Sequence, residues 1–158
     1  MKNTITLFVL FILITVSIGA QTGQVISVST QHTELILKVG EDGRLYQNYF
    51  GAKLTRSGDE KSLPRPVHLA YVTSGTDNLF EPAIRMTHND GNPSLELKYD
   101  SHQVEKQDDN VTLTHIKLKD PQYPVEVILH FKAFGQEDVI EQQVEISHQE
   151  KNPVTLYN

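Results

Sequence analysis

Hydrophobic and polar residues alternate along most of the chain beyond residue 30, which is the two-residue period of β-strands with one buried face. The segment "TELILKVG" places three apolar residues on one face: Leu35, Leu37 and Val39. Ile36 falls on the opposite face, between the charged residues of the segment. "EDG" then predicts a turn that ends at Gly43, and "RLYQNYFG" resumes the extended pattern. We therefore predict a β-hairpin from these two segments.

A second hairpin is predicted towards the C-terminal end of the sequence. "VEVILHFKAF" places five apolar residues on one face: Val125, Val127, Leu129, Phe131 and Ala133. A turn is expected at residues 135–138, and "VIEQQVEIS" follows it with Ile140, Val144 and Ile146 on a common face. These two segments should pair as antiparallel strands.

A third hairpin is predicted between residues 83–88 and 95–100, where the intervening "HNDGNP" contains an Asp-Gly pair, a strong turn signal. In "NVTLTHIKLKD" the apolar period slips by one residue at Thr114–His115, which predicts a β-bulge. Residues 55–66, "TRSGDEKSLPRP", lose the alternation and should form a long loop. With no sustained helical period, the expected fold is an all-β, antiparallel β-sandwich.

The first twenty residues have the pattern of a signal peptide. Lys2 precedes the apolar run "LFVLFILITVSIG", and Ser17, Gly19 and Ala20 are small residues suited to a cleavage site. The apolar run is shorter than the roughly 20 residues that span a bilayer. We expect cleavage near Ala20, export to the periplasm or the extracellular space, and a single mature domain over residues 21–158.

The charge balance and the absence of cysteine exclude some classes of partner and of chemistry. The mature segment carries 13 Lys and Arg against 20 Asp and Glu, which disfavours nucleic acid and anionic membrane surfaces as partners. The sequence has no cysteine, so disulfides and thiol or zinc-thiolate chemistry are excluded. The seven histidines are at least thirteen residues apart, which is not a metal-ligand spacing. We predict no metal site and no cofactor.

Other candidate groups each have a structural alternative. Adjacent acids occur at Asp59–Glu60, Asp108–Asp109 and Glu137–Asp138, where solvated turns are expected rather than catalysis. Asn110-Val111-Thr112 is a glycosylation sequon, for which the alternative is a chance tripeptide in a host that does not glycosylate it. Four aromatic residues are able to stack on a sugar or to pack in the core: Tyr46, Tyr49, Phe50 and Tyr99. We assign no catalytic residue, and the substrate-binding residues stay unknown.

Several segments, in order, resemble the N-terminal domain of glycoside hydrolase family 36, the α-galactosidases. The segment from Thr73 to Glu105 carries the matching positions Gly75, Thr76, Pro82, Ala83, Asp90, Gly91, Leu97, Tyr99, Ser101 and His102. "LYQNYFGAKL", "VEVILHFKAFGQEDVIEQQVEI" and "KNPVTLYN" resemble further strands and turns of that domain. The chain departs from the pattern at Gln142 and Gln143, where the family usually has an arginine, and at Asp77 to Phe80.

The resemblance implies a supersandwich-like β-domain that packs on a (β/α)₈ barrel and takes part in subunit association. In the family, the barrel carries two carboxylates of a retaining mechanism, and its nucleophile follows a Lys-Trp pair. This sequence has no tryptophan and ends within a strand-like run, "VTLYN", so we expect a truncated domain. Family members also place a neighbouring subunit's loop near the active site; here the corresponding loop is short and contains Asp59 and Arg65.

Two functional interpretations follow from the sequence. The first is the non-catalytic N-terminal part of an exported α-galactosidase, which meets α-galactoside substrate only through the full-length enzyme. The second is a free-standing secreted β-sandwich that binds carbohydrate or acts as a scaffold.

Overall fold

The computed structural model describes residues 23–56, 58–75 and 80–157. The predicted signal peptide, residues 1–20, lies outside this part of the chain, as do Thr76 and Asp77 of the resemblance. One four-stranded sheet has the order β1-β2-β3-β4, formed by Val25–Ser29, Thr33–Val39, Leu45–Ala52 and His68–Leu69. A larger sheet has the order β6-β7-β8-β9, formed by Lys98–Lys106, Val111–Lys119, Val125–Phe134 and Val139–His148.

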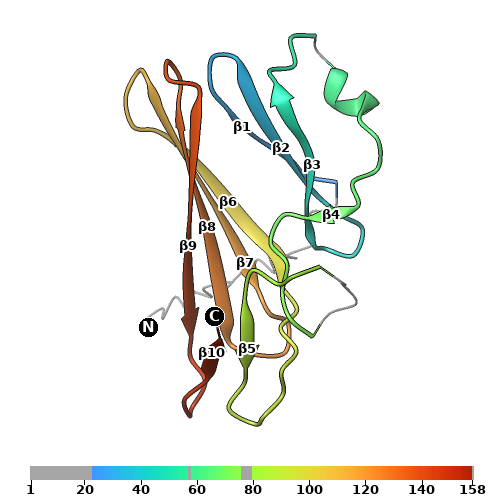
Figure 1. Ribbon diagram of the computed structural model, residues 1–158, viewed down its shortest axis with the longest axis vertical. Helices are drawn as coiled ribbons and strands as arrows, with labels where there is room; N and C mark the ends of the chain where they lie inside the picture. Colours follow the sequence, from blue (N-terminus) through green and yellow to red (C-terminus); the bar gives the residue numbers. More distant parts are fainter. Residues whose placement is uncertain (1–22, 57, 76–79, 158) are drawn as a thin grey trace, which may run out of the picture.

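Two short strands, β5 (Arg85–Thr87) and β10 (Thr155–Tyr157), pair with each other at one end of the molecule (Figure 1). All the strand pairs of the three sheets are antiparallel. A short 3₁₀ helix, η1 (Asp59–Ser62), lies in the long loop between β3 and β4. The predicted antiparallel β-sandwich is therefore confirmed.

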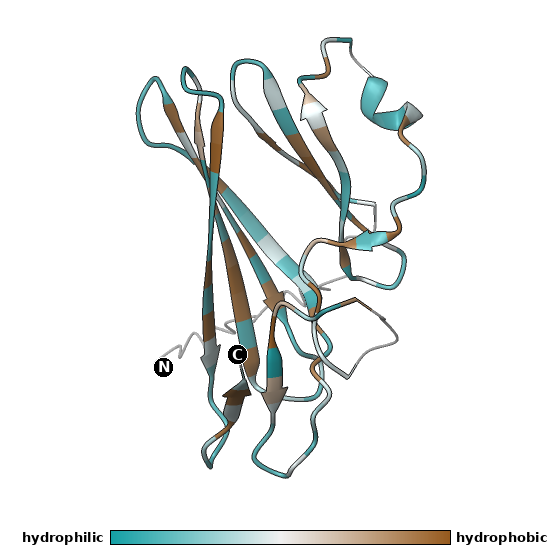
Figure 2. Cartoon of the chain, in the orientation of Figure 1, coloured by the Kyte–Doolittle hydropathy of each residue, from teal (hydrophilic) through white to brown (hydrophobic). Residues whose placement is uncertain are grey.

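The core lies between the two four-stranded sheets, where their alternating apolar residues meet. Figure 2 shows hydrophobic stretches on β7 and β8, at the centre of the larger sheet. The buried cluster comprises Ile26, Val28, Leu35, Leu37, Val39, Leu45, Ile84, Met86, Leu95, Leu97, Ile116, Leu118, Val125, Val127, Leu129, Phe131 and Ala133. It contains all the apolar positions predicted on the buried faces of β2 and β8. Burial of these side chains is the main stabilising contribution to the fold.

The hairpins predicted at the two ends of the sequence are both confirmed. β2 pairs with β3 through a turn in which Gly43 has a φ of +77°. β8 pairs with β9 over ten residues, with Leu129 opposite Val144 and Ala133 opposite Ile140. Because β9 is the edge strand of its sheet, Val144 is 38% exposed although it points to the core side.

Ile36 corrects one detail of the prediction. It is only 3% exposed, although the alternation placed it on the polar face of β2. The loop after β3 returns across this face, so that Leu54 and Thr55 line a shared depression with Ile36. Glu34 anchors the loop, because its carboxylate accepts a hydrogen bond of 3.0 Å from the Leu54 backbone NH. On the outer face of β2, Ile36 is thus buried beside this loop, while Glu34 and Lys38 stay partly exposed.

The bulge predicted at Thr114–His115 was wrong. β7 pairs with β8 in unbroken register from Val111 to Lys119, and Thr114 occupies a core position with 1% exposure. Register shifts occur instead on β6, between Tyr99 and Ser101, and in the β2–β3 pairing, between Ile36 and Leu37. The strand stays regular because Leu113 can lie on the half-covered outer face while the small Thr114 fits between core side chains.

The third predicted hairpin is correct in its turn and wrong in its pairing. The turn closes with a 2.8 Å hydrogen bond from His88 NH to Asn92 carbonyl oxygen. The segments on either side do not pair with each other, since β5 pairs with β10 and β6 pairs with β7. Pro93 has no NH for a ladder, and the Leu95 NH bonds to Ser74 instead. The chain is thereby led from one sheet to the next.

Candidate functional site

An open depression of about 570 Å³ lies beside the β2–β3 turn. It is lined by Gly23, Lys38, Val39, Gly40, Glu41, Asp42, Tyr46, Arg65 and Pro66. An aromatic ring surrounded by carboxylate and cationic side chains is the kind of surface on which a sugar stacks and forms hydrogen bonds. This depression is therefore the candidate ligand site among the residues that the structure describes.

Asp42 and Tyr46 are held together at this depression. The Tyr46 hydroxyl donates a 2.7 Å hydrogen bond to Asp42 Oδ2, and the Arg44 backbone NH donates one of 3.1 Å to Oδ1. Partial burial acts to raise the pKa of Asp42, but these hydrogen bonds and the charges of Arg44 and Lys98 outweigh it and lower the pKa below the usual value. Asp42 is therefore an anion at neutral pH, suited to binding and not to proton donation.

Gly40 makes this arrangement possible. A Cβ atom at this position would lie 2.6 Å from Asp42 Oδ1 and 2.7 Å from Tyr46 Cε2. Any other residue would therefore displace the ring or the carboxylate from the wall of the depression.

The two loop residues named in the sequence analysis lie in different surroundings. Arg65 lines the depression with Tyr46. Asp59 lies in η1, where its carboxylate accepts a hydrogen bond of 3.3 Å from the Arg56 NH. Of the pair, only Arg65 is thus placed beside the candidate site.

The remaining aromatic candidates lie elsewhere. The Tyr49 hydroxyl donates to the Ala52 carbonyl oxygen at 2.6 Å, and Tyr99 packs against the core. Phe50, near the end of β3, is 62% exposed. Tyr99 Oη also lies 2.7 Å from His102 Nδ1, so these two positions of the resemblance have a structural role.

The adjacent acids identified in the sequence have structural roles in turns. Asp108 accepts hydrogen bonds of 2.8 Å from the NH groups of Asn110 and Val111. Asp138 accepts hydrogen bonds from the side chains of His32 and Thr30 and from the His32 NH, which lower its pKa to about 2. Asp138 therefore does not resemble a catalytic acid, whose pKa is raised towards the working pH.

The sequon asparagine is also engaged within the fold. Asn110 Nδ2 donates to Glu137 Oε2 at 2.8 Å, and its Oδ1 accepts the Gln136 NH at 2.7 Å. Both polar atoms of the Asn110 side chain thus have partners within the fold.

The sequence analysis did not identify a buried polar cluster that is formed by His88, Tyr123 and Glu150. His88 Nδ1 lies 2.7 Å from Glu150 Oε1, and its Nε2 lies 2.9 Å from the Ser94 carbonyl oxygen. The His88 ring stacks on Tyr123 with 3.6 Å between ring centroids. Burial acts to raise the pKa of Glu150, but the Asn89 NH and His88 outweigh it and lower the pKa. The only sequence signal was the Asx-rich turn "HNDGN", because the partners are distant along the chain.

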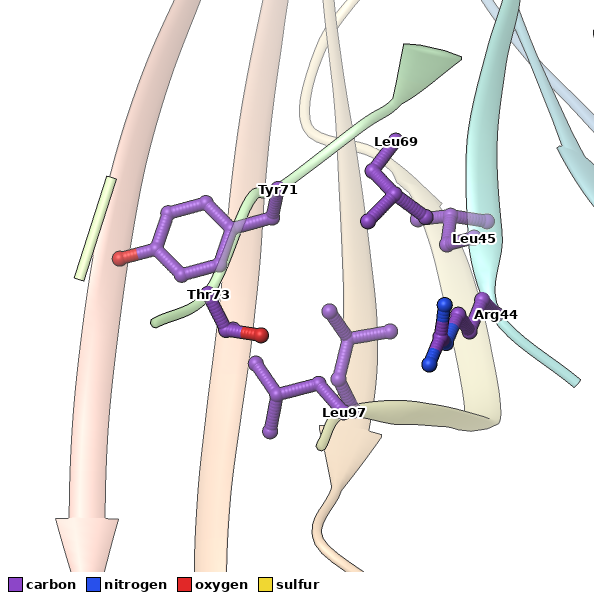
Figure 3. Close-up of a pocket in the computed structure, with 7 residues that line it drawn as sticks. Arg44, Leu45, Leu69, Tyr71, Thr73 and Leu97 are labelled. Carbon is purple, nitrogen blue, oxygen red and sulfur yellow. The ribbon is translucent and has the colours of Figure 1, made fainter. Parts of the chain in front are cut away.

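A small enclosed cavity lies between the two larger sheets. Figure 3 shows Tyr71, Thr73 and Leu97 around it, with Leu45, Leu69 and Arg44 on the other side. Its volume of about 10 Å³ admits at most one water molecule, so it is not a sugar site.

No group of three or more His, Asp or Glu side chains is arranged to hold a metal ion in the described part of the chain. Within the same residues, no helix is long and apolar enough to cross a membrane.

Comparison with solved structures shows where this fold occurs. The α-galactosidase of Lactobacillus brevis has a TM-score of 0.73 and 18% sequence identity over 87% of this chain and 23% of that chain. The galactosidase domain of an α-galactosidase–sucrose kinase, AgaSK, has a TM-score of 0.73 and 20% identity over 84% of this chain and 23% of its own. The α-galactosidase AgaA of Geobacillus stearothermophilus has a TM-score of 0.71 and 15% identity, with 84% and 23% covered.

This chain spans less than a quarter of the length of those enzymes. No curated protein sequence matches it significantly. The family model for the glycosyl hydrolase family 36 N-terminal domain matches residues 43–158, which is most of the chain. The chain therefore belongs to glycosyl hydrolase family 36, of which it carries the N-terminal, non-catalytic domain.

Proposed function

We propose that this chain is the N-terminal part of an exported α-galactosidase, whose catalytic carboxylates lie in a separate barrel domain. The observation that carries the proposal is the family match over residues 43–158. In the solved α-galactosidase structures, the part that resembles this chain makes up 23% of the enzyme's length. In this function the sandwich packs on the barrel, covers part of its rim and supports subunit association. Export rests on the signal-like segment at residues 1–20.

The side chains of this domain support a non-catalytic role. Retaining hydrolysis requires a nucleophile and a protonated acid with carboxyl groups about 5 Å apart. The pKa values of Asp42, Glu96, Asp138 and Glu150 are instead lowered from their ordinary values. These four carboxylates orient backbone and side-chain donors and are not suited to donate a proton to a leaving group.

The exposed apolar residues support a partner surface on this domain. Phe50 on β3 and Val104 on β6 are 62% and 58% exposed, although both lie in strands of the sandwich. A contact that covers them would bury apolar surface and contribute to association. In the proposed enzyme, this contact is made by the barrel or by a neighbouring subunit.

The proposal is tested by determining the DNA sequence that follows codon 158 and by assaying the chain. We expect a reading frame that encodes a Lys-Trp-Asp motif within an alternation of strands and helices. The purified chain should not hydrolyse an aryl α-galactoside. Turnover that is abolished by substituting one Asp or Glu of this chain would overturn the proposal.

A second candidate function rests on the depression beside Tyr46. Its aromatic ring, its anionic Asp42 and its loop cation Arg65 favour a free-standing sugar-binding module. Under that function, the chain alone binds galactosides, and Tyr46→Ala removes binding while Tyr49→Ala does not. If neither the parent nor the variants bind galactosides, the second function is overturned and only the enzyme-domain proposal remains.

A further inference from the structure

Two histidines face each other on the outer surface of the larger sheet. His115 of β7 lies directly opposite His130 of β8 in the antiparallel register. Their Nδ1 atoms are 2.7 Å apart, and the ring centroids are 4.8 Å apart with 74° between the ring planes. Both residues are half-buried, and neither belongs to the apolar core. The pair lies fifteen residues apart in sequence, so only the sheet register brings it together.

The neighbouring carboxylate orients one of the two rings. Glu145 of β9 places Oε2 at 3.4 Å from His130 Nε2. A carboxylate in this position favours a proton on Nε2 and leaves the Nδ1 lone pair directed towards His115. Histidines that bind metals commonly have this arrangement, in which the second ring nitrogen donates to a carboxylate.

We propose that His115 and His130 form a two-nitrogen chelate for a divalent metal of tetragonal preference, Cu²⁺ or Ni²⁺, with water at its remaining positions. Imidazole nitrogens bind such metals at roughly 2.0 to 2.1 Å, so two cis ligands at a right angle are about 2.8 to 3.0 Å apart. A tetrahedral metal such as Zn²⁺ requires about 3.3 to 3.4 Å between the same atoms. The observed separation of 2.7 Å therefore needs less adjustment for the tetragonal ions.

The charged side chains around the two histidines are compatible with a bound cation. Lys117, in the neighbouring row of β7, is paired with Glu126 at 3.0 Å. Lys132 on β8 lies over the Phe134 ring, 5.0 Å from its centroid. Gln103 and Gln143 occupy the ends of the row that contains both histidines, and Glu145 adds a negative charge beside it. A metal ion would displace the proton of the hydrogen bond between the two Nδ1 atoms, which is released to solvent, and would link β7 to β8.

The test is a titration of the full chain with Cu²⁺, Ni²⁺ and Zn²⁺, followed by calorimetry and by electron paramagnetic resonance of the Cu²⁺ form. We expect one equivalent of Cu²⁺ with a tetragonal spectrum and coupling to two ring nitrogens. His115→Gln and His130→Gln should each weaken Cu²⁺ binding by at least about tenfold. The matched control is His68→Gln, which alters an exposed histidine on β4 and should bind as the parent does.

Glu145→Gln separates the chelate from a non-specific surface effect. It should weaken Cu²⁺ binding by several-fold without changing the number of coordinated nitrogens, because it acts only through His130. Circular dichroism verifies that each variant is folded. The proposal is overturned if His115→Gln and His130→Gln bind Cu²⁺ as the parent does, or if the spectrum shows a single ring nitrogen. The outcome is independent of the proposed function, because Cu²⁺ binding is measured on this chain alone.

Discussion

His88 and Glu150 form a buried side-chain contact, with 2.7 Å between Nδ1 and Oε1 and side chains that are 0% and 1% exposed. The contact joins the turn after β5 to the segment between β9 and β10. It therefore fixes the position of the last described strand against the body of the sandwich. A buried contact of this kind is costly to break on one side only, because the remaining group is left without a partner.

Glu150→Gln should accordingly destabilise the fold by about 1 to 2 kcal/mol, because the neutral amide has a single acceptor oxygen for the two groups, the His88 ring and the Asn89 NH, that contact the carboxylate. The measurement is urea denaturation at neutral pH, followed by circular dichroism. Glu105→Gln, an exposed residue of β6, is the matched control and should change the free energy of unfolding by less than about 0.5 kcal/mol. Equal midpoints for both variants would contradict the buried contact.

The stability of the fold should also fall in acid through Glu150. Its pKa is lowered from 4.5 in the folded state, so its contribution is fully present above the ordinary value and is lost as the pH falls through the folded-state value. The parent should therefore lose more stability than Glu150→Gln between about pH 5 and pH 3. Parallel curves for the two proteins across this range would refute the assignment.

Asp138 should titrate well below an ordinary aspartate. Hydrogen bonds from His32 and Thr30 lower its pKa from 3.8 to about 2, so its stabilising effect is present above pH 3.8 and disappears as the pH falls towards 2. Carbon NMR of the carboxyl group measures this midpoint directly. Thr30→Val removes one donor and should raise the midpoint, whereas a midpoint near 3.8 in the parent would show that the bonds are absent in solution.

Two residues that are directly opposite each other should differ sharply in their contribution to stability. Leu129 on β8 is fully buried, and its partner Val144 on the edge strand β9 is 38% exposed. Leu129→Ala should cost about 3 kcal/mol, and Val144→Ala less than about 1 kcal/mol, because only the first leaves a cavity. Chemical denaturation of both variants measures the difference. Similar losses would imply that β9 is covered in solution.

Gly75 should tolerate no side chain. Its φ is +73°, and a Cβ atom would lie 2.5 Å from Ser94 Cα. Gly75→Ala should therefore cost more than Gly91→Ala, in which the φ of +89° imposes strain of about 1 kcal/mol but no atom lies within 4 Å. The comparison of the two thermal unfolding midpoints isolates the steric effect. A Gly75→Ala variant as stable as Gly91→Ala would show that the loop moves aside.

The local pattern of the sequence predicted the β2–β3 and β8–β9 hairpins and the core-facing residues of β2 and β8, but it did not identify β1 or β4. The alternation at Leu35, Leu37 and Val39 and along β8 identifies the core side because successive side chains of a strand point to opposite faces. The turn signals at Gly43 and Asp90–Gly91 were likewise correct, since they depend on the conformations of a few adjacent residues. The resemblance to glycoside hydrolase family 36 rested on the order of several short segments along the chain, and the family match over residues 43–158 confirms it.

Tertiary structure decided everything that depends on partners distant in sequence. The alternation placed Ile36 on the outer face, but only the returning loop decides that this face is buried. The same holds for β5, which pairs with β10 instead of the nearby segment after its turn. It also holds for the contacts of His88 with Glu150 and of His115 with His130. A sequence period reports which face a side chain occupies, whereas a contact depends on which other strand or loop covers that face.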